Sequence, residues 1–399
     1  MSTRIILFLA MACGLIAANI YYAQPLAGPI SSELRLSVEA TGLIVTLTQI
    51  GYGTGLLLIV PLSDLVENRK VIVVMVGTVA LGLVGAAAAP HALWFLASAF
   101  VVGLGSSAMQ IIVPYAAHMA PDNERGRAVG IVMSGLLLGM MLARPVASAI
   151  TQLSSWRMVF VVAASAMTLL AMLLRLNLPT RQPASDSRYF ALLTSMWHLV
   201  LTIPALRRRT FYHACLFASF SLFWTTVPLL LTGPLFQLSQ GAIALFALAG
   251  AGGVVAAPIA GHIADRGWTK PATAIAMSGV AIAFLIARAA MDGSNVSLGL
   301  LVVTGLVVDF GVAAHMIISQ RVIFSLRPEY RGRLNGIYIA TIFLGGAVGS
   351  AFGGWAYASG GWPLTCWLGF SFPIIAIATF ATESNWLDLL GRARRFRTR

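Results

Sequence analysis

The sequence predicts an all-α membrane protein in which twelve transmembrane helices form two similar six-helix bundles. Three observations predict this fold class: a very apolar composition, a regular series of apolar segments, and a repeat that relates the two halves of the chain. Of the 399 residues, 58% are hydrophobic and 10% are charged, and the mean hydropathy is +0.86. Soluble proteins carry roughly 25% charged residues. This chain has too few charges to cover a surface that faces water, so most of its surface must face lipid.

Twelve apolar segments are long enough to cross a bilayer, because about 20 helical residues span a hydrocarbon core of roughly 30 Å. We place them at residues 5–27, 40–62, 71–89, 92–117, 128–150, 157–177, 210–232, 240–262, 271–290, 297–320, 334–358 and 363–382. The short alternating segments of a transmembrane barrel do not fit this pattern, so we expect helices. The first segment could also be a cleaved signal peptide, because Arg4 precedes an apolar run. The later segments favour a retained helix.

Positively charged residues predict the orientation of the chain. If the N-terminus is cytoplasmic, 22 of the 26 Lys and Arg residues fall in cytoplasmic segments, three fall at outer loops or helix ends, and Arg144 falls within a span. An odd number of spans would reverse the sign of every later loop. We therefore expect a multi-pass protein of the cell inner membrane with both termini in the cytoplasm.

The longest polar stretch divides the chain into two halves. We predict an N-terminal six-helix bundle over residues 1–177, a cytoplasmic linker over 178–209, a C-terminal six-helix bundle over 210–382 and a basic cytoplasmic tail over 383–399. Within the linker, residues 189–203 could form an amphipathic helix on the membrane surface.

The two halves also repeat one another in sequence. At an offset of 206 residues, Arg125 pairs with Arg331, Arg127 with Arg333, Gly139 with Gly345, and Trp156 with Trp362. Repeated six-helix halves are a known route to alternating access, in which a ligand binds between the halves near the middle of the membrane.

Two loops carry an Asp followed by basic residues, and other basic residues lie at matching positions of the repeat. An Asp at a helix end that faces Arg or Lys across a short loop can latch helices together on the cytoplasmic side. The alternative is a solvated loop whose charges only set the topology. The candidate latch residues are Asp64, Arg69, Lys70, Asp265, Arg266, Arg125, Arg127, Arg331 and Arg333.

The second of these loops, residues 261–267 (GHIADRG), resembles the loop signature of the major facilitator superfamily. Residues 61–70 keep the Asp and the basic pair of that signature without its glycines. Residues 19–26 (NIYYAQPL) and 309–335 resemble a bacterial branch of twelve-helix drug or metabolite:proton antiporters. The resemblance covers nearly the whole chain, and it implies a permease that acts as a proton-driven exporter.

The sequence departs from that branch at two positions that concern coupling. The similar antiporters carry an Arg ahead of a Gly in span 4, where this chain has Ala99 before Gly103. Their Gly-Pro signature in span 5 is replaced by Ala143-Arg144-Pro145.

Two charged residues lie deep within the predicted spans, Arg144 in span 5 and Asp309 in span 10. A charged side chain at the centre of a membrane helix costs roughly 2.5–3.5 kcal/mol on translocon scales, so such residues are candidate functional groups. Helical rise places Arg144 about 24 Å and Asp309 about 18 Å from the cytoplasmic ends of their helices. We hypothesise that Asp309 carries a proton or binds a cation, and that Arg144 is its partner or binds an anion. A static ion pair that holds the halves in register is the alternative.

Helix geometry adds neighbours to this candidate site. Met316 and Gln320 share the face of Asp309 at about 100° per residue, whereas His315 points elsewhere and is expected to be a packing residue rather than a proton shuttle. Asn19 and Tyr22 share a face of span 1, and a bare amide such as Asn19 is unfavourable against lipid. Phe220 and Trp224 lie one turn apart in span 7, where they line a cavity, face lipid or pack in the core.

The sequence argues against several other classes of function. Its net charge of +13 is distributed between apolar blocks rather than gathered in one patch, so we do not expect a nucleic-acid partner. We find no Walker A loop and no cluster of metal ligands, and we expect no cofactor and no metal. A membrane enzyme would need clustered catalytic residues, and a sensor would need a soluble output domain.

The remaining interpretation is that the protein is a monomeric secondary transporter of a small organic molecule, with protons as the coupling ion. The expected direction is export of a drug or metabolite. Uptake of a small metabolite by the same fold is the alternative.

Overall fold

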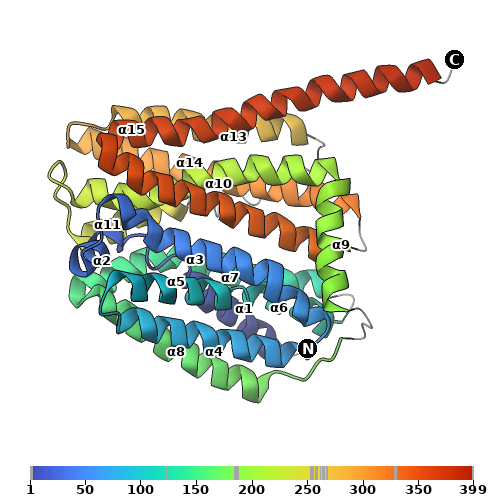
Figure 1. Cartoon of the computed structure of the whole chain (residues 1–399), viewed down its shortest axis with the longest axis horizontal. Helices are drawn as coiled ribbons and strands as arrows, with labels where there is room; N and C mark the ends of the chain where they lie inside the picture. The colour runs from blue at the N-terminus through green and yellow to red at the C-terminus, as the bar shows by residue number, and fades with distance from the viewer. Residues whose placement is uncertain are drawn as a thin grey trace.

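The computed structural model of the chain is a set of long helices that lie side by side (Figure 1). It describes residues 3–121, 124–183, 188–251, 256, 259–260, 262, 266, 268–327 and 330–397. Within these residues every regular element is helical, and the arrangement is the predicted one of two six-helix bundles.

The helices of the first half are α1 (Thr3–Ala18), α2 (Ala27–Leu34), η1 (Glu39–Gly42), α3 (Leu43–Thr54), η2 (Gly55–Ile59), η3 (Val60–Asp64), α4 (Asn68–Ala87), α5 (Ala92–Ser106), α6 (Met109–Met119), α7 (Arg125–Leu153) and α8 (Trp156–Asn177). Those that follow are α9 (Tyr189–Thr202), α10 (Pro204–Thr232), α11 (Gln240–Phe246), η4 (Ala247–Ala251), α13 (Thr269–Ala289), α14 (Asn295–Leu326) and α15 (Arg331–Arg397). The η elements are 3-10 helices, except that η2 is a π-helix.

Nine helical stretches of the described residues are long and apolar enough to cross a membrane. The last of them holds both predicted spans 11 and 12, because α15 consists of two helices joined at Gly360 and Gly361, where the backbone is not helical and Gly361 adopts a φ of +62°. Shorter apolar helices stand at spans 1 and 8. Part of span 8, between residues 252 and 262, lies outside the described residues.

Span 1 is not the continuous helix that the apolar run predicts. Helix α1 ends at Ala18, and the chain passes through turns before α2 begins at Ala27. The Asn19 side chain donates to the carbonyl oxygens of Leu15 at 2.9 Å and Ile16 at 3.2 Å, which competes with the helical pattern. Pro25 lies within the break and has no N–H to donate. The break places residues 19–26 at the interior of the molecule as irregular backbone.

Small residues allow the backbones of two helix pairs to approach closely. Helix α1 packs on α7 where Gly14 faces Gly135 and Gly139, and α10 packs on α15 where Ala214 and Ala218 face glycines of α15. The two contacts occupy corresponding places in the repeat, and small residues are typical of such close helix contacts in membranes. Each bundle therefore contains at least one tightly joined pair of helices.

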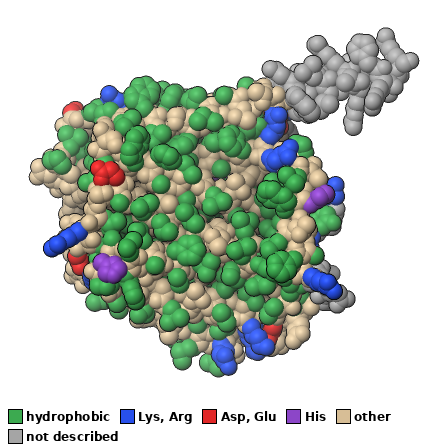
Figure 2. Space-filling view, viewed as in Figure 1, with side chains coloured by type: hydrophobic (Ala, Val, Ile, Leu, Met, Phe, Trp, Pro, Cys, Tyr) green, Lys and Arg blue, Asp and Glu red, His purple; other side chains and the backbone are tan. Residues whose placement is uncertain are grey.

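The two ends of the molecule differ. We call the end that carries Asp64, Arg69, Lys70, Arg331 and Arg333 the basic end. On the face seen in Figure 2, most Lys and Arg side chains lie at that end, and hydrophobic side chains cover the middle. This distribution matches a surface that meets lipid between two polar layers.

At the end opposite the basic end, the two bundles are joined along both of their seams. Thr46 Oγ1 of α3 lies 2.8 Å from Ser350 Oγ of α15. Gly354 of α15 packs closely on the backbone of Gly42, because a Cβ added to Gly354 would lie only 2.7 Å from the Gly42 amide nitrogen. On the other seam, the Gly241 amide at the start of α11 donates to Gln152 Oε1 of α7 at 3.0 Å. The bundles are thus closed against each other at this end.

The α1–α7 contact gives a prediction for stability. Replacing Gly139 by Ala puts a methyl group against the backbone of Gly14, and overpacking of this kind costs about 1–3 kcal/mol. Gly139→Ala should therefore lower the midpoint of thermal unfolding in detergent.

The matched control is Gly130→Ala in the same helix, where an added Cβ meets no atom within 4 Å. That variant should keep or slightly raise the midpoint, because Ala is the better helix former. Equal midpoints for the two variants would contradict the close α1–α7 contact.

Candidate functional site

Arg144 of α7 and Asp309 of α14 meet between the two bundles. The Arg144 Nη1 atom lies 3.9 Å from Asp309 Oδ1, and the residues are 4% and 8% exposed. This separation is too long for a hydrogen bond, so the two groups interact as charges. We refer to Arg144 and Asp309 as the central pair.

Each member of the central pair is oriented by a hydrogen bond within its own half of the chain. Arg144 Nε donates to Gln24 Oε1 at 2.8 Å, and Gln24 lies in the break between α1 and α2. Trp224 Nε1 of α10 donates to Asp309 Oδ2 at 2.7 Å. Hydrogen bonds to charged groups are shorter and stronger than neutral ones, so these contacts fix where each charge points.

Aromatic rings surround the guanidinium of the central pair. Its central carbon lies 4.1 Å from the ring centre of Trp224, 5.1 Å from that of Phe220 and 5.3 Å from that of Tyr21. Rings within about 6 Å attract a cation through their faces. The rings thus supply part of the stabilisation that water would give to an exposed Arg.

Polar groups beside the central pair have capacity for further hydrogen bonds. Gln24 Nε2 and the Tyr21 hydroxyl are buried and have no hydrogen-bond partner among the described residues. The backbone of η4 comes close at Gly250, where an added Cβ would lie 3.0 Å from Arg144 Nη1 and 3.5 Å from Asp309 Oδ1. The site therefore offers one cation, one carboxylate and two uncommitted donors within an aromatic enclosure.

A cavity of about 410 Å³ opens at the basic end between the bundles. It is mostly apolar, with polar groups from both halves and one wall from α9. Its lining consists of Leu56, Val60, Pro61, Ser63, Asp64, Gln110, Val113, Pro114, Ala117, His118, Val129, Leu192, Met196, Phe324, Arg331, Gly332, Arg333, Asn335 and Gly336.

Aromatic side chains connect this cavity to the central pair. Gln110 at the cavity donates to the Tyr52 hydroxyl at 3.1 Å. The Tyr52 ring lies 4.3 Å from that of Phe343, which lies 5.0 Å from Phe217, which in turn lies 5.0 Å from Phe220. Because Phe220 contacts the guanidinium, these rings form a layer between the cavity and the central pair. We call Tyr52, Phe343, Phe217 and Phe220 the aromatic layer.

Polar side chains also bridge the bundles beside this layer. Gln49 Nε2 of α3 donates to Ser221 Oγ of α10 at 2.9 Å, and Gln49 and Ser221 are fully buried. Such a neutral bridge can exchange its partner for another polar group at low cost, unlike a buried unpaired charge.

The residues predicted from helix geometry are not all at the central pair. The structure brings Phe220 and Trp224 to it, whereas Asn19 donates to Met167 Sδ at 3.4 Å within the first bundle. Gln320 donates to Asn335 Oδ1 at 3.2 Å, so it lies beside the basic-end cavity. Tyr22 and Met316 are partly buried against the core.

The predicted latch residues have different partners from those expected. Arg69 Nε and Lys70 Nζ lie 3.2 Å and 3.4 Å from the carboxylate of Glu67, which follows η3 and is nearer in the chain than Asp64. Asp64 instead lines the cavity together with Arg331 and Arg333 of the other half.

The remaining latch candidates are placed as follows. Arg333 Nη1 donates to Ser195 Oγ of α9 at 2.7 Å, and Arg331 Nε donates to the Phe324 carbonyl at 3.0 Å. Arg125 and Arg127 are exposed at the start of α7. Asp265 lies outside the described residues.

A buried histidine pair joins α10 to α14. The Nδ1 atoms of His213 and His315 lie 2.7 Å apart, and both residues are fully buried. One Nδ1 must donate and the other accept, so the two rings hold different tautomers. Arg209 interacts electrostatically with His315 and donates to Thr273 Oγ1 at 2.8 Å. His315 is therefore a bonded packing residue of the second bundle, away from the central pair.

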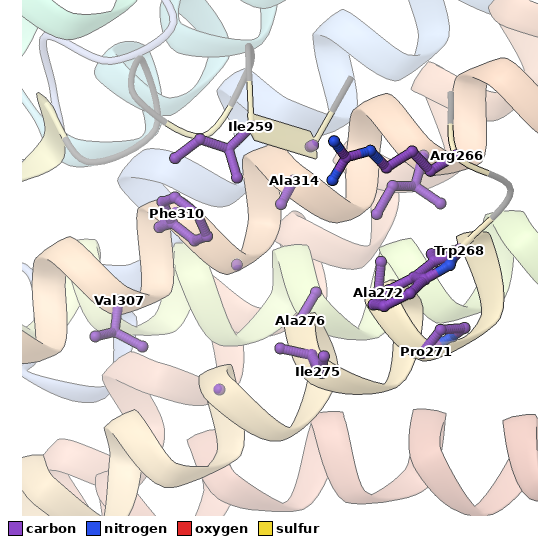
Figure 3. A pocket seen from close by; sticks show the side chains of 14 residues that line it. Ile259, Arg266, Trp268, Pro271, Ala272, Ile275, Ala276, Val307, Phe310 and Ala314 are labelled. Atoms are coloured by element: carbon purple, nitrogen blue, oxygen red, sulfur yellow. The ribbon is translucent and has the colours of Figure 1, made fainter. Parts of the chain in front are cut away.

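A second cavity, of about 390 Å³, lies within the second half of the chain (Figure 3). Side chains of α13 and α14, such as Ile275, Ala276 and Phe310, surround it, and Arg266 and Trp268 lie at one end. None of the described residues that line it belongs to the first bundle. It is therefore separate from the contact between the bundles.

Sequence reasoning missed several residues of the site. Gln24 and Tyr21 were within a stretch that resembles a family motif, but a helical projection of an unbroken span 1 does not direct them at span 5. Gln49 could have been identified as a site residue, because an amide within an apolar span needs a hydrogen-bond partner. Nothing in the sequence around His213 distinguishes it from a packing residue.

Comparisons with known proteins place this geometry in context. A family model described as "Major Facilitator Superfamily" matches residues 7–301 and 244–385. A transporter of Escherichia coli (strain K12), YgaY, is 37% identical over 375 residues, which is 94% of each chain. A chloramphenicol efflux pump of Mycobacterium tuberculosis is 22% identical over 250 residues, covering 62% of this chain and 60% of that one.

Solved structures share the fold. A nucleoside transporter superimposes with a TM-score of 0.77 at 14% identity, covering 94% of this chain and 99% of that one. A D-xylose-proton symporter superimposes with a TM-score of 0.75 at 16% identity, covering 94% and 96% of the two chains.

The central pair gives a second stability prediction. Asp309→Asn leaves a buried cation without its counter-charge, and Arg144→Gln leaves a buried carboxylate in the same situation. Removing one partner of a buried pair costs about 3–5 kcal/mol. Each single variant should unfold at a clearly lower temperature than the parent protein in detergent, and the double variant should recover much of the loss.

The control for this cycle is Lys70→Gln, which removes an ion pair with Glu67 in which the Lys70 side chain is 72% exposed and which is expected to contribute about 0–1 kcal/mol. A double variant as unstable as the sum of the two single variants would show that the central residues are not energetically coupled.

Proposed function

The chain belongs to the major facilitator superfamily and is a transporter, and on this premise we propose that it exports a small organic molecule across the inner membrane in exchange for protons, with Asp309 as the proton carrier. The observation that carries the proposal is the central pair, a carboxylate and a guanidinium buried together where the two bundles meet. The relatives are transporters rather than enzymes.

Alternating access accounts for the difference between the two ends of the molecule. The bundles are joined at Thr46–Ser350 and at Gln152–Gly241, and they enclose an open cavity at the basic end. By the distribution of positive charge, the basic end faces the cytoplasm. In this proposal the structure represents the inward-open state, in which a molecule from the cytoplasm reaches the aromatic layer first.

Protonation of Asp309 would change the central pair in a way that suits coupling. The ionised carboxylate of Asp309 can bind a cationic or hydrogen-bond-donating group of the substrate, whereas the protonated carboxyl group no longer attracts such a group. Uptake of a proton by Asp309 therefore releases the substrate, and binding of the substrate requires that the proton has left. Proton and substrate compete for one carboxylate, which is the requirement for exchange.

Closure of the basic end would bring the charges of the cavity together. Asp64 from the first half and Arg333 from the second half line the same cavity and already interact electrostatically. We propose that they form the latch of the outward-open state, whereas Glu67 with Arg69 and Lys70 serves as a fixed loop contact.

Uptake is the second candidate function, because a D-xylose-proton symporter shares this fold. The relative named as a chloramphenicol efflux pump supports export. The two directions differ in whether substrate and proton occupy the site together or in turn, and competition of both for the carboxylate of Asp309 favours occupation in turn.

A proteoliposome assay tests this proposal. Vesicles with an imposed pH gradient are offered a panel that includes chloramphenicol, D-xylose and nucleosides, and accumulation of any member identifies a working substrate. With that compound, Asp309→Asn should lose gradient-driven transport by at least about tenfold, because about 1.4 kcal/mol of lost coupling is one decade. The variant should retain exchange of labelled for unlabelled substrate, since exchange needs no net proton transfer.

Asp292→Asn is the matched control. Asp292 is an exposed carboxylate in the connection between α13 and α14, and it does not contact the central pair. It should transport as the parent protein does. Unimpaired gradient-driven transport by Asp309→Asn would remove Asp309 from the coupling mechanism.

A further inference from the structure

Helix α9 crosses the basic end and touches both halves of the molecule (Figure 1). Its Tyr189 hydroxyl donates to the Leu58 carbonyl of the first half at 2.7 Å, and its Ser195 hydroxyl accepts from Arg333 of the second half. Leu192 and Met196 are buried and line the basic-end cavity. The inner face of α9 is thus a side wall of that cavity.

The outer face of α9 is also apolar. Phe190, Trp197 and Leu201 are 78%, 65% and 53% exposed. Their spacings of seven and four residues place them in one stripe along the helix. A helix with both faces apolar needs an apolar environment on each side, and the described part of the protein supplies only the inner one.

Positive charge flanks this stripe on both sides. Arg188 precedes α9 and is exposed, and Arg207 follows it and is exposed. No Asp or Glu occurs anywhere between residues 188 and 209. A helix with large apolar side chains and flanking basic residues is typical of segments that lie in the headgroup region of an anionic membrane.

The chain connection fixes the depth of α9. It ends at Thr202, and α10, which is a membrane-spanning helix, begins at Pro204. With one residue between them, α9 cannot move far from the point where α10 enters the bilayer. The stripe must therefore lie at the membrane boundary.

We propose that the stripe of Phe190, Trp197 and Leu201 docks into the anionic phospholipids of the cytoplasmic leaflet, so that lipid holds the side wall of the cavity in place. The assignment to the cytoplasmic leaflet rests on the orientation in the proposed function. The occupant is lipid rather than a second copy of the chain, because the stripe is one helix wide and is flanked by like charges that would repel their own copies.

Site-directed spin labelling tests the proposal on the full-length protein. Single cysteines at Phe190→Cys, Trp197→Cys and Leu201→Cys are labelled in turn and reconstituted in vesicles of phosphatidylglycerol with phosphatidylethanolamine. The three native cysteines are buried, and labelled parent protein measures their background. Oxygen, which partitions into lipid, and a water-soluble nickel chelate report the surroundings of each label.

The matched control is His198→Cys, which is exposed on α9 beside the stripe. The ratio of oxygen to nickel accessibility should be several-fold higher at the three stripe positions than at His198→Cys. In vesicles of phosphatidylcholine alone, the ratio at the stripe should fall toward the control, as should the ratio in an Arg188→Gln/Arg207→Gln background in phosphatidylglycerol.

Three results would overturn the proposal. One is nickel accessibility at the stripe equal to that of the control, which means that the stripe faces water. Another is spin–spin broadening that grows with protein concentration in the vesicles, which means that a second copy covers it. The third is equal ratios in the anionic and zwitterionic vesicles, which removes the anionic partner. No substrate is used, so failure here leaves the proton-coupling proposal intact, and failure of Asp309→Asn to affect transport leaves this one intact.

Discussion

The structure depends on the placement of two opposite charges where the medium offers little solvation. A lone guanidinium or carboxylate at this depth would be strongly unfavourable, and Arg144 and Asp309 come from different halves of the chain. The bundles therefore cannot part at the central pair unless water, a proton or a ligand takes over the balance of charge. This constraint ties the relative position of the bundles to the protonation of one carboxylate.

The packing around the pair fits motion of the bundles as two bodies. Glycines and alanines hold α1 against α7 in one half, and α10 against α15 in the other. These contacts lie inside each bundle and are close-packed. Between the bundles, a close-packed contact of Gly354 with Gly42 closes the end opposite the basic end, whereas single hydrogen bonds, such as Gln49 with Ser221, and aromatic rings form the contacts beside the aromatic layer. Close-packed contacts resist deformation, while single polar contacts exchange partners readily. The seam beside the aromatic layer is therefore easier to open than the contacts inside each bundle.

Much of this arrangement could be predicted from the sequence, and the failures have a common cause. Apolar length, positive charge and the 206-residue repeat identify the spans and the two-bundle fold, because these properties depend on composition along the chain. Arg144 and Asp309 could be found because charges are conspicuous in apolar spans. The partners of a side chain depend on the rotation and offset of one helix against another, which periodicity does not contain. For this reason helical projection places Gln320 on the face of Asp309, although its hydrogen-bond partner is Asn335 beside the basic-end cavity. The loop pattern likewise points to Asp64, although Glu67 is the carboxylate that contacts Arg69 and Lys70. The break in span 1, which brings Gln24 to Arg144, needs the three-dimensional setting of Pro25.

The geometry of the central pair also argues against a static ion pair that only holds the halves in register. A static pair would be expected to use a bidentate Arg–carboxylate contact, which is the strongest geometry available to these groups. Here each charged group forms its hydrogen bond within its own half, Arg144 with Gln24 and Asp309 with Trp224, while the charges themselves remain 3.9 Å apart. Stacking of the guanidinium on the rings of Phe220 and Trp224 crosses the seam, but a ring face holds a cation without fixing its direction. Each half thus keeps its own charge in position when the other half moves, and the contact across the seam is the one that is weak enough to be broken and remade.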